Sequence, residues 1–183
     1  MDNLCSIGND LDFQSIKDNI NLVLWNHFEN LWSVKINRES AIRGQGRNKL
    51  RTYRTFKQSF KAEQYVKSVI SRKARQSLAK FRCGTAPLRI ETGRYVGERE
   101  HDRLCVLCDA MEVENEEHCL IRCNRYADIR NTLFAAAINI DNTFLDKTDN
   151  EKMSFVLANE NLVFETAKAC QHILHTRSMF LQH

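Results

Sequence analysis

The sequence has only one proline and six glycines among its 183 residues. With few helix-breaking residues and 43% hydrophobic residues, the composition favours a folded helical protein over a disordered one. Every apolar run is far shorter than the roughly 18 residues that span a bilayer, so no transmembrane helix is predicted. The N-terminus carries acids where a secretory or transit peptide carries positive charge. We therefore expect an intracellular protein, nuclear or cytoplasmic, that does not contact a membrane.

Basic residues are concentrated in one segment. Residues 35–82 contain fifteen lysines and arginines and only two acids, although the whole chain has a net charge of +4. Aromatic residues stand between these cations, a combination that suits phosphate contacts and base stacking. A solvated helix face is the competing interpretation, but such faces usually mix charges of both signs. The candidate nucleic-acid-binding residues are Arg51, Arg54, Lys57, Lys61, Arg72, Lys73 and Arg75.

Apolar spacing predicts long amphipathic helices. Steps of three and four residues keep one face of a helix against a core, and three parts of the chain show this spacing. The predicted helices cover residues 13–36, 50–81 and 153–180, and a shorter one covers 126–138. A break near Lys61 is compatible with the second of them. We expect the three long helices to pack on one another, so the predicted fold class is mainly α.

Glycine and proline mark the predicted boundaries. Two glycines within 43–48 predict a loop, and Gly84 followed by Pro87 ends the second long helix. In chain order, we predict an N-terminal amphipathic helix and loop (1–46), a basic helix with a zinc-binding module (47–135) and a C-terminal helical region (136–183).

In a reducing compartment, the seven cysteines favour metal ligands and buried thiols over disulfides. Four potential ligands follow the pattern Cys-x2-Cys-x9-His-x4-Cys. Two cysteines separated by two residues can turn both sulfurs toward one ion. A histidine and a cysteine about one helical turn apart then complete a tetrahedral shell. We predict a Zn²⁺ site in a small zinc knuckle beside the helical core, formed by Cys105, Cys108, His118 and Cys123.

Cys119 is an alternative ligand. It lies four residues before Cys123, on the same face of a helix, and could replace His118 in the set. In either set, four protein ligands leave no open position on the metal, so the zinc is structural and the protein is not expected to be an enzyme. The acidic loop from Asp109 to Glu117 is expected to lie in solvent, because unpaired buried carboxylates are costly.

The cysteine and histidine pattern stands within a longer motif. The motif consists of Leu78-Ala79-Lys80-Phe81-Arg82, Leu88, Gly93-Arg94-Tyr95, Arg103, the Cys105/Cys108 pair, a Glu-rich loop, His118, Cys123, Tyr126 and Arg130. Over about residues 47–135 the chain resembles the zinc-binding segment that follows the polymerase in reverse transcriptases of non-LTR retrotransposons, including jockey-like elements. The resemblance implies zinc binding and help in holding RNA or single-stranded DNA for a reverse transcriptase core.

The chain departs from that family in two respects. It has no Tyr-x-Asp-Asp type polymerase motif, and Asn124 follows the last cysteine where family members usually have a proline. Polymerase activity is therefore not implied. The expected function is a structural zinc-binding, nucleic-acid-binding module derived from a reverse transcriptase tail. The alternative is a protein-interaction module or a purely structural remnant of a larger polymerase.

Overall fold

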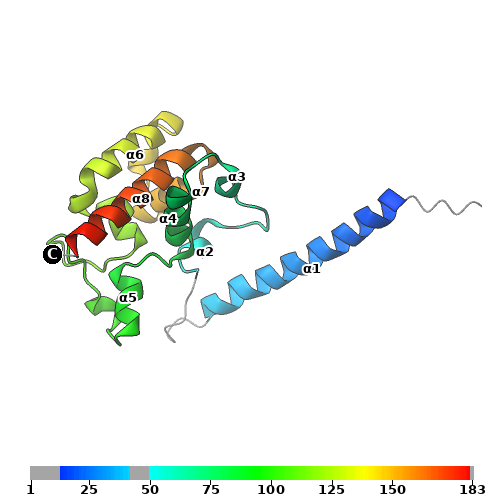
Figure 1. Ribbon diagram of the computed structural model, residues 1–183, viewed down its shortest axis with the longest axis horizontal. Helices are drawn as coiled ribbons and strands as arrows, with labels where there is room; N and C mark the ends of the chain where they lie inside the picture. Colours follow the sequence, from blue (N-terminus) through cyan, green and yellow to red (C-terminus); the bar gives the residue numbers. More distant parts are fainter. Residues whose placement is uncertain (1–12, 42–49, 182–183) are drawn as a thin grey trace, which may run out of the picture. The chain divides into compact units, whose positions relative to one another are not determined.

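The computed structural model describes residues 13–41 and 50–181 (Figure 1). The chain divides into two compact units, residues 1–42 and 43–183. Within the described ranges every regular element is helical, and Leu104 and Val113 form one isolated antiparallel bridge. The predicted mainly α fold class is confirmed. The loop predicted over 43–48 lies outside the described residues.

The first unit contains helix α1 (Phe13–Ala41). The predicted helix over 13–36 is therefore confirmed and extends further. Its large apolar side chains are mostly exposed, and Trp25, for example, is 48% exposed. The packing of this helix on the other long helices remains a prediction. None of the helices in the described ranges combines the length and the apolarity that crossing a bilayer requires.

The basic segment does not form one long helix. It forms three separate helices, α2 (Tyr53–Phe56), α3 (Gln64–Lys67) and α4 (Arg72–Cys83). The helical region predicted over 50–81 is therefore interrupted. The break expected near Lys61 is present between α2 and α3, and a second break precedes α4. Side-chain contacts hold the chain in extended turns at these breaks. Lys57 leaves the helical conformation and buries its amine against Glu63. Ser71 starts α4 by accepting a hydrogen bond from the backbone N–H of Ala74 at 3.2 Å.

Gly84 ends α4, as the sequence predicts. Its φ of +67° lies in the left-handed region, which a glycine adopts without steric cost. A Cβ at this position would stand 2.8 Å from Cγ of Arg51, so the site also requires a small residue for close packing. The chain continues through the short helix α5 (Arg89–Tyr95) into the cysteine-rich loop.

Three further helices complete the second unit. They are α6 (Ala127–Ile140), α7 (Asp149–Ala158) and α8 (Val163–Phe180). The prediction over 126–138 is confirmed, whereas the single helix predicted over 153–180 is wrong. The break falls at Asn159, which leaves the helical conformation and accepts a hydrogen bond from the N–H of Asn161 at 2.9 Å. Single-turn segments connect the helices, namely η1 (Glu100–Asp102), η2 (His118–Arg122), η3 (Asn124–Tyr126), η4 (Phe144–Asp146) and η5 (Glu160–Leu162).

Helix α8 is the centre of the second unit. It packs against α4, α6 and α7 and also contacts η2 (Figure 1). One hydrophobic core joins these elements, and its fully buried members include Phe81, Leu133 and Ile173. The boundary expected at 135/136 falls inside α6, whose buried residues belong to this core.

Candidate metal centre

The four predicted ligands converge on one point. The ligand atoms of Cys105, Cys108, His118 and Cys123 all lie within 4.8 Å of one another. Within the cluster, Sγ of Cys108 lies 3.3 Å from Nε2 of His118. Zinc–sulfur bonds of about 2.3 Å in a tetrahedral shell separate two sulfurs by roughly 3.8 Å. The four side chains are thus close enough to bind a metal ion with small rotamer adjustments.

The isolated bridge between Leu104 and Val113 brings the acidic loop back beside Cys105. The N–H of Cys105 donates to the carbonyl of Glu112 at 2.8 Å, and the N–H of Glu114 donates to the carbonyl of Arg103 at 2.9 Å. These bonds flank the Leu104–Val113 bridge. Because the bridge fixes the two sides of the loop, the residues that follow it begin η2 beside the cysteine pair.

A π-helical turn aligns the second ligand pair. Segment η2 is π-helical, and the N–H of Cys123 donates to the carbonyl of His118 at 2.7 Å. In an α-helix, with about 100° per residue, residues five apart would point roughly 140° away from each other. The wider π turn brings residue 123 back over residue 118. Asn115 starts the turn, since its Oδ1 accepts from the N–H of His118 at 2.8 Å.

The geometry groups His118, and not Cys119, with the three other ligands. Among the described residues, the cluster of potential metal ligands comprises Cys105, Cys108, His118 and Cys123. The Cys119 side chain is fully buried in the hydrophobic core. Burial, with a further contribution from Glu114, raises the pKa of the Cys119 thiol well above its ordinary value. Cys119 thus has the surroundings of a buried apolar residue.

Glu112 orients the histidine. Its Oε2 lies 3.0 Å from Nδ1 of His118 and accepts a hydrogen bond from Nε of Arg122 at 2.7 Å. A carboxylate at Nδ1 holds the proton there and leaves the Nε2 lone pair for a metal. The Nε2 atom is the one that faces Cys108. This role of Glu112 was not predicted, because sequence spacing does not distinguish it from the other acids of the loop.

Proton sharing links the ligands. Hydrogen bonding to Cys105 lowers the pKa of Cys123, and the same contact together with burial raises the pKa of Cys105 to about 12. Burial by itself lowers the pKa of His118, but hydrogen bonds to Cys105 and Glu112 outweigh it and raise the pKa above its ordinary value. A metal ion must therefore displace protons from these groups when it binds.

Replacing Glu112 with alanine is expected to weaken metal binding by about 10- to 100-fold, the typical effect of losing such a partner. Without the carboxylate, the His118 ring is free to rotate and to change its tautomer. A competition titration against a chromogenic chelator measures the affinity. Asp109→Ala removes an exposed acid of the same loop and is the matched control. Equal affinities for the two variants would exclude this positioning role.

The acidic loop is only partly in solvent. Glu114 is fully buried, and Glu116 is 2% exposed, so the prediction of a solvated loop is wrong for these residues. Each buried carboxylate has an arginine from a distant part of the chain: Glu114 pairs with Arg177, and Glu116 pairs with Arg51 at 2.7 Å. The prediction of a knuckle outside the core is also wrong. Cys105 and Cys123 belong to the hydrophobic core, because the paired carboxylates allow the loop to be enclosed.

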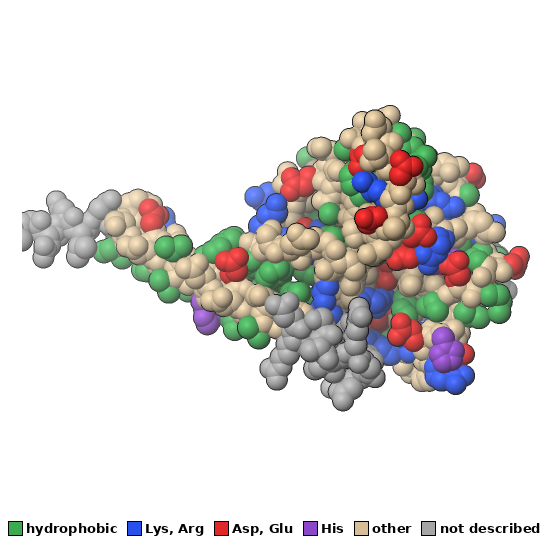
Figure 2. Space-filling view, turned by 180° about the vertical axis from the view of Figure 1, so that it is seen from behind, with side chains coloured by type: hydrophobic (Ala, Val, Ile, Leu, Met, Phe, Trp, Pro, Cys, Tyr) green, Lys and Arg blue, Asp and Glu red, His purple; other side chains and the backbone are tan. Residues whose placement is uncertain are grey.

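The predicted nucleic-acid-binding residues differ in their surroundings. Arg51, Lys57 and Arg75 bond within the protein: Arg51 to Glu116, Lys57 to the carbonyl of Lys61 at 2.9 Å, and Arg75 to the carbonyl of Ser68 at 2.9 Å. Arg54 is half-buried, whereas Lys61, Arg72 and Lys73 are exposed. Figure 2 shows Lys and Arg side chains at the surface of the 43–183 unit, some of them beside acidic residues.

Three exposed cations of the basic run were not among the predicted residues, namely Lys35 in α1, Lys67 in α3 and Lys80 in α4. The basic run of the sequence therefore includes these cations. The spacing expected for one long helix did not distinguish its exposed positions from its internal ones.

No protein family model matches the chain, and neither curated proteins nor solved structures show a significant similarity to it.

Proposed function

We propose that the chain is a structural zinc-binding module that holds RNA or single-stranded DNA and has no polymerase activity of its own. The observation that carries the proposal is the convergence of three cysteines and one histidine within 4.8 Å. Thiolate and imidazole ligands suit zinc, and four of them leave no position for water or substrate. The ion would therefore stabilise the fold and would not take part in a reaction.

The nucleic-acid contact would be made by the exposed cations within residues 57–82. These are Lys61, Lys67, Arg72, Lys73 and Lys80. The one acid within residues 57–82 is Glu63, and its carboxylate is engaged by Lys57 and Arg82. The accessible charge of this segment is therefore positive, which suits a phosphate backbone.

The first turn of α4 supports a role in anion binding. Arg72 and Lys73 stand at the N-terminus of the helix, which has no acid in its first turn. Cations at this end oppose the helix macrodipole and cost about 0.3 to 1 kcal/mol each. Helix stability therefore does not explain these residues, whereas a phosphate bound near them would offset the cost.

The proposed origin is the tail of a retrotransposon reverse transcriptase. It rests on the residue pattern from Leu78 to Arg130 alone. A reverse transcriptase core would then be a partner, and zinc would hold the module in shape while the basic segment contacts the strand.

A protein-interaction or structural module is the second candidate, and helix α1 favours it. Large apolar side chains of this helix are exposed, with Phe13 at 80% and Val23 at 66%. An exposed apolar surface of this kind is typical of protein docking. Apolar docking changes little with salt, whereas phosphate binding weakens steeply. A salt titration therefore separates the two candidates.

Replacing Arg72 and Lys73 together with alanine is expected to reduce the salt dependence of RNA binding. Each phosphate contact contributes about 0.7 to the slope of log affinity against log salt for single strands, so the slope should fall by about 1.4. Fluorescence anisotropy with a labelled single-stranded RNA measures it. Arg75 is left in place because it bonds to backbone carbonyls.

The matched control removes two lysines from the C-terminal helices, Lys152→Ala with Lys168→Ala. This variant carries the same change in charge outside the basic segment. If both double variants give the same slope while remaining folded, the cations of α4 form only a solvated face, and the interaction module becomes the better explanation.

A further inference from the structure

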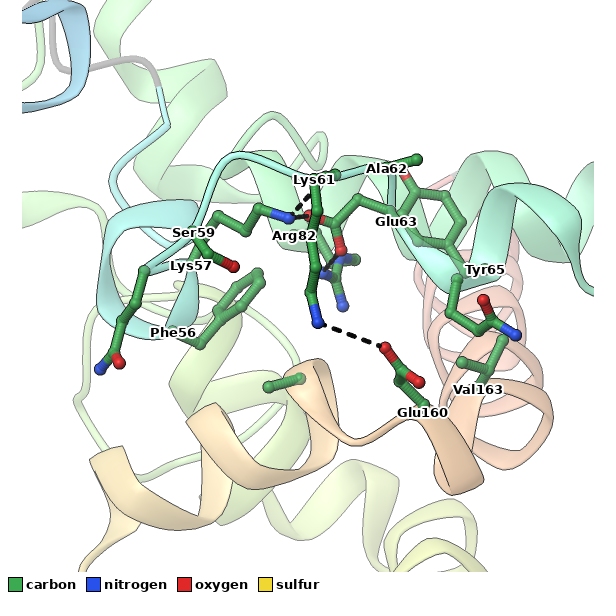
Figure 3. Close-up of a pocket in the computed structure, with 13 residues that line it drawn as sticks. Phe56, Lys57, Ser59, Lys61, Ala62, Glu63, Tyr65, Arg82, Glu160 and Val163 are labelled. Atoms are coloured by element: carbon green, nitrogen blue, oxygen red, sulfur yellow. Dashed lines mark hydrogen bonds and ion pairs between the residues drawn. The ribbon is translucent and has the colours of Figure 1, made fainter. Parts of the chain in front are cut away.

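A cavity lies between the basic segment and the junction of α7 and α8. It has a volume of about 250 Å³. Figure 3 shows its lining residues from the chain after α2, from the start of α3, from α4 and from the α7–α8 junction. The zinc ligands do not line it. It is therefore a separate feature of the second unit.

The wall of the cavity carries more positive than negative charge. Lys57 and Arg82 both have side chains that are 6% exposed, and both pair with Glu63. Among the described residues, no other carboxylate lies within ion-pair distance of these two cations. Two buried cations thus share one acid. An uncompensated charge in a poorly solvated wall attracts an anion from solvent.

Arg82 also has an unused donor. Its Nε–H is buried and has no hydrogen-bond acceptor among the described residues. The guanidinium is held in place, because its carbon lies 4.5 Å from the ring centre of Phe56 and 5.1 Å from that of Tyr65. Both aromatic residues are half-buried and line the cavity, and aromatic rings are surfaces on which a flat ligand can pack.

A weak ion pair spans the opening. Nζ of Lys61 lies 3.8 Å from Oε1 of Glu160, and their side chains are 64% and 59% exposed. Figure 3 shows the Lys61 side chain reaching across the cavity toward Glu160. Such a long, exposed pair contributes little stability. Lys61 can therefore turn from Glu160 to a ligand, while Glu160 repels an anion at the same place.

We propose that this cavity binds one phosphate-bearing nucleotide, either free or as part of a single strand. The excess positive charge and Lys61 would hold the phosphate, and Phe56 and Tyr65 would contact the base. The volume is slightly below the 300 to 1,000 Å³ range of drug-sized ligand pockets, which limits the ligand to a single nucleotide. When the source is a strand, this inference rests on the proposed nucleic-acid-binding function.

Calorimetric titration of the full chain with adenosine 5′-monophosphate, adenosine and inorganic phosphate tests the proposal. The nucleotide is expected to bind one to one and more tightly than either part. Lys61→Gln should weaken its binding about two- to five-fold, and Glu160→Gln should strengthen it about two- to five-fold, as expected for single exposed charges. Lys168→Gln and Glu165→Gln make the same changes in charge on α8 and should have no effect.

The same variants are titrated with single-stranded RNA to identify the source of the nucleotide. If only RNA binds and its affinity follows Lys61 and Glu160 in these directions, the ligand is a nucleotide within a strand. If the mononucleotide binds but RNA does not, the cavity proposal stands and the proposed nucleic-acid function fails. If RNA binds with an affinity that is insensitive to both variants, and the mononucleotide does not bind, the cavity proposal is overturned and the proposed function stands. Absence of binding by both ligands overturns both.

Discussion

Removing the metal is expected to unfold the whole 43–183 unit and not only a surface loop. Cys105, His118 and Cys123 are buried, and the two cysteines belong to the core that α8 shares with α4 and α6. Structural zinc contributes about 10 to 16 kcal/mol in small zinc-binding peptides, as much as the whole 5 to 15 kcal/mol that stabilises a typical domain. Chelation should therefore abolish cooperative thermal unfolding followed by circular dichroism.

The ligand variants make this expectation specific. Cys123→Ser should lose about one equivalent of zinc, because it removes one of four ligands. Cys119→Ala should keep the full equivalent, and so should Cys83→Ala, which changes a half-buried thiol outside the cluster. If His118→Ala keeps the metal while Cys119→Ala loses it, Cys119 is the fourth ligand. Metal-free protein from a reducing, chelator-free preparation that unfolds cooperatively would contradict the zinc site itself.

Replacing Arg177 with methionine is expected to cause the largest loss of stability among substitutions outside the metal cluster. Arg177 in α8 donates two hydrogen bonds to Glu114, from Nε and Nη2, each at 2.9 Å. Glu114 also accepts from the backbone N–H of Arg89 at 2.8 Å and is fully buried. Without the arginine, the carboxylate is left buried and unpaired, at a cost of about 3 to 5 kcal/mol. The midpoint of thermal unfolding should fall by roughly 10 °C.

Two controls separate the buried pair from charge in general. Arg99→Met breaks an exposed pair with Asp102 and should change the stability little, because solvent screens exposed charges. Glu114→Gln combined with Arg177→Met removes both buried charges and should recover part of the loss, because no ion remains unpaired. If Arg177→Met is no more destabilising than Arg99→Met, the pair does not tie the acidic loop to α8.

Local features of this protein were predictable from the sequence. The helix over 13–36 and the helix over 126–138 follow from apolar spacing and composition, and both exist. The end of α4 at Gly84 follows from backbone sterics, which depend on one residue. The ligand types and their spacing similarly indicated which four side chains could meet, since each pair is joined by few residues.

Tertiary structure decided which charges are internal. The basic run predicted one cationic helix, but Glu63 and Glu116 engage Lys57 and Arg51, so part of the run stabilises the fold. Glu116 lies 65 residues from Arg51, and Glu114 lies 63 residues from Arg177. Neither composition nor periodicity reports on partners at such separations. The role of Glu112 likewise depends on the π turn that places His118 beside it. Sequence spacing indicated the four side chains that lie close enough to bind a metal ion. Burial and long-range ion pairing determined what surrounds these side chains and which cations remain exposed to a ligand.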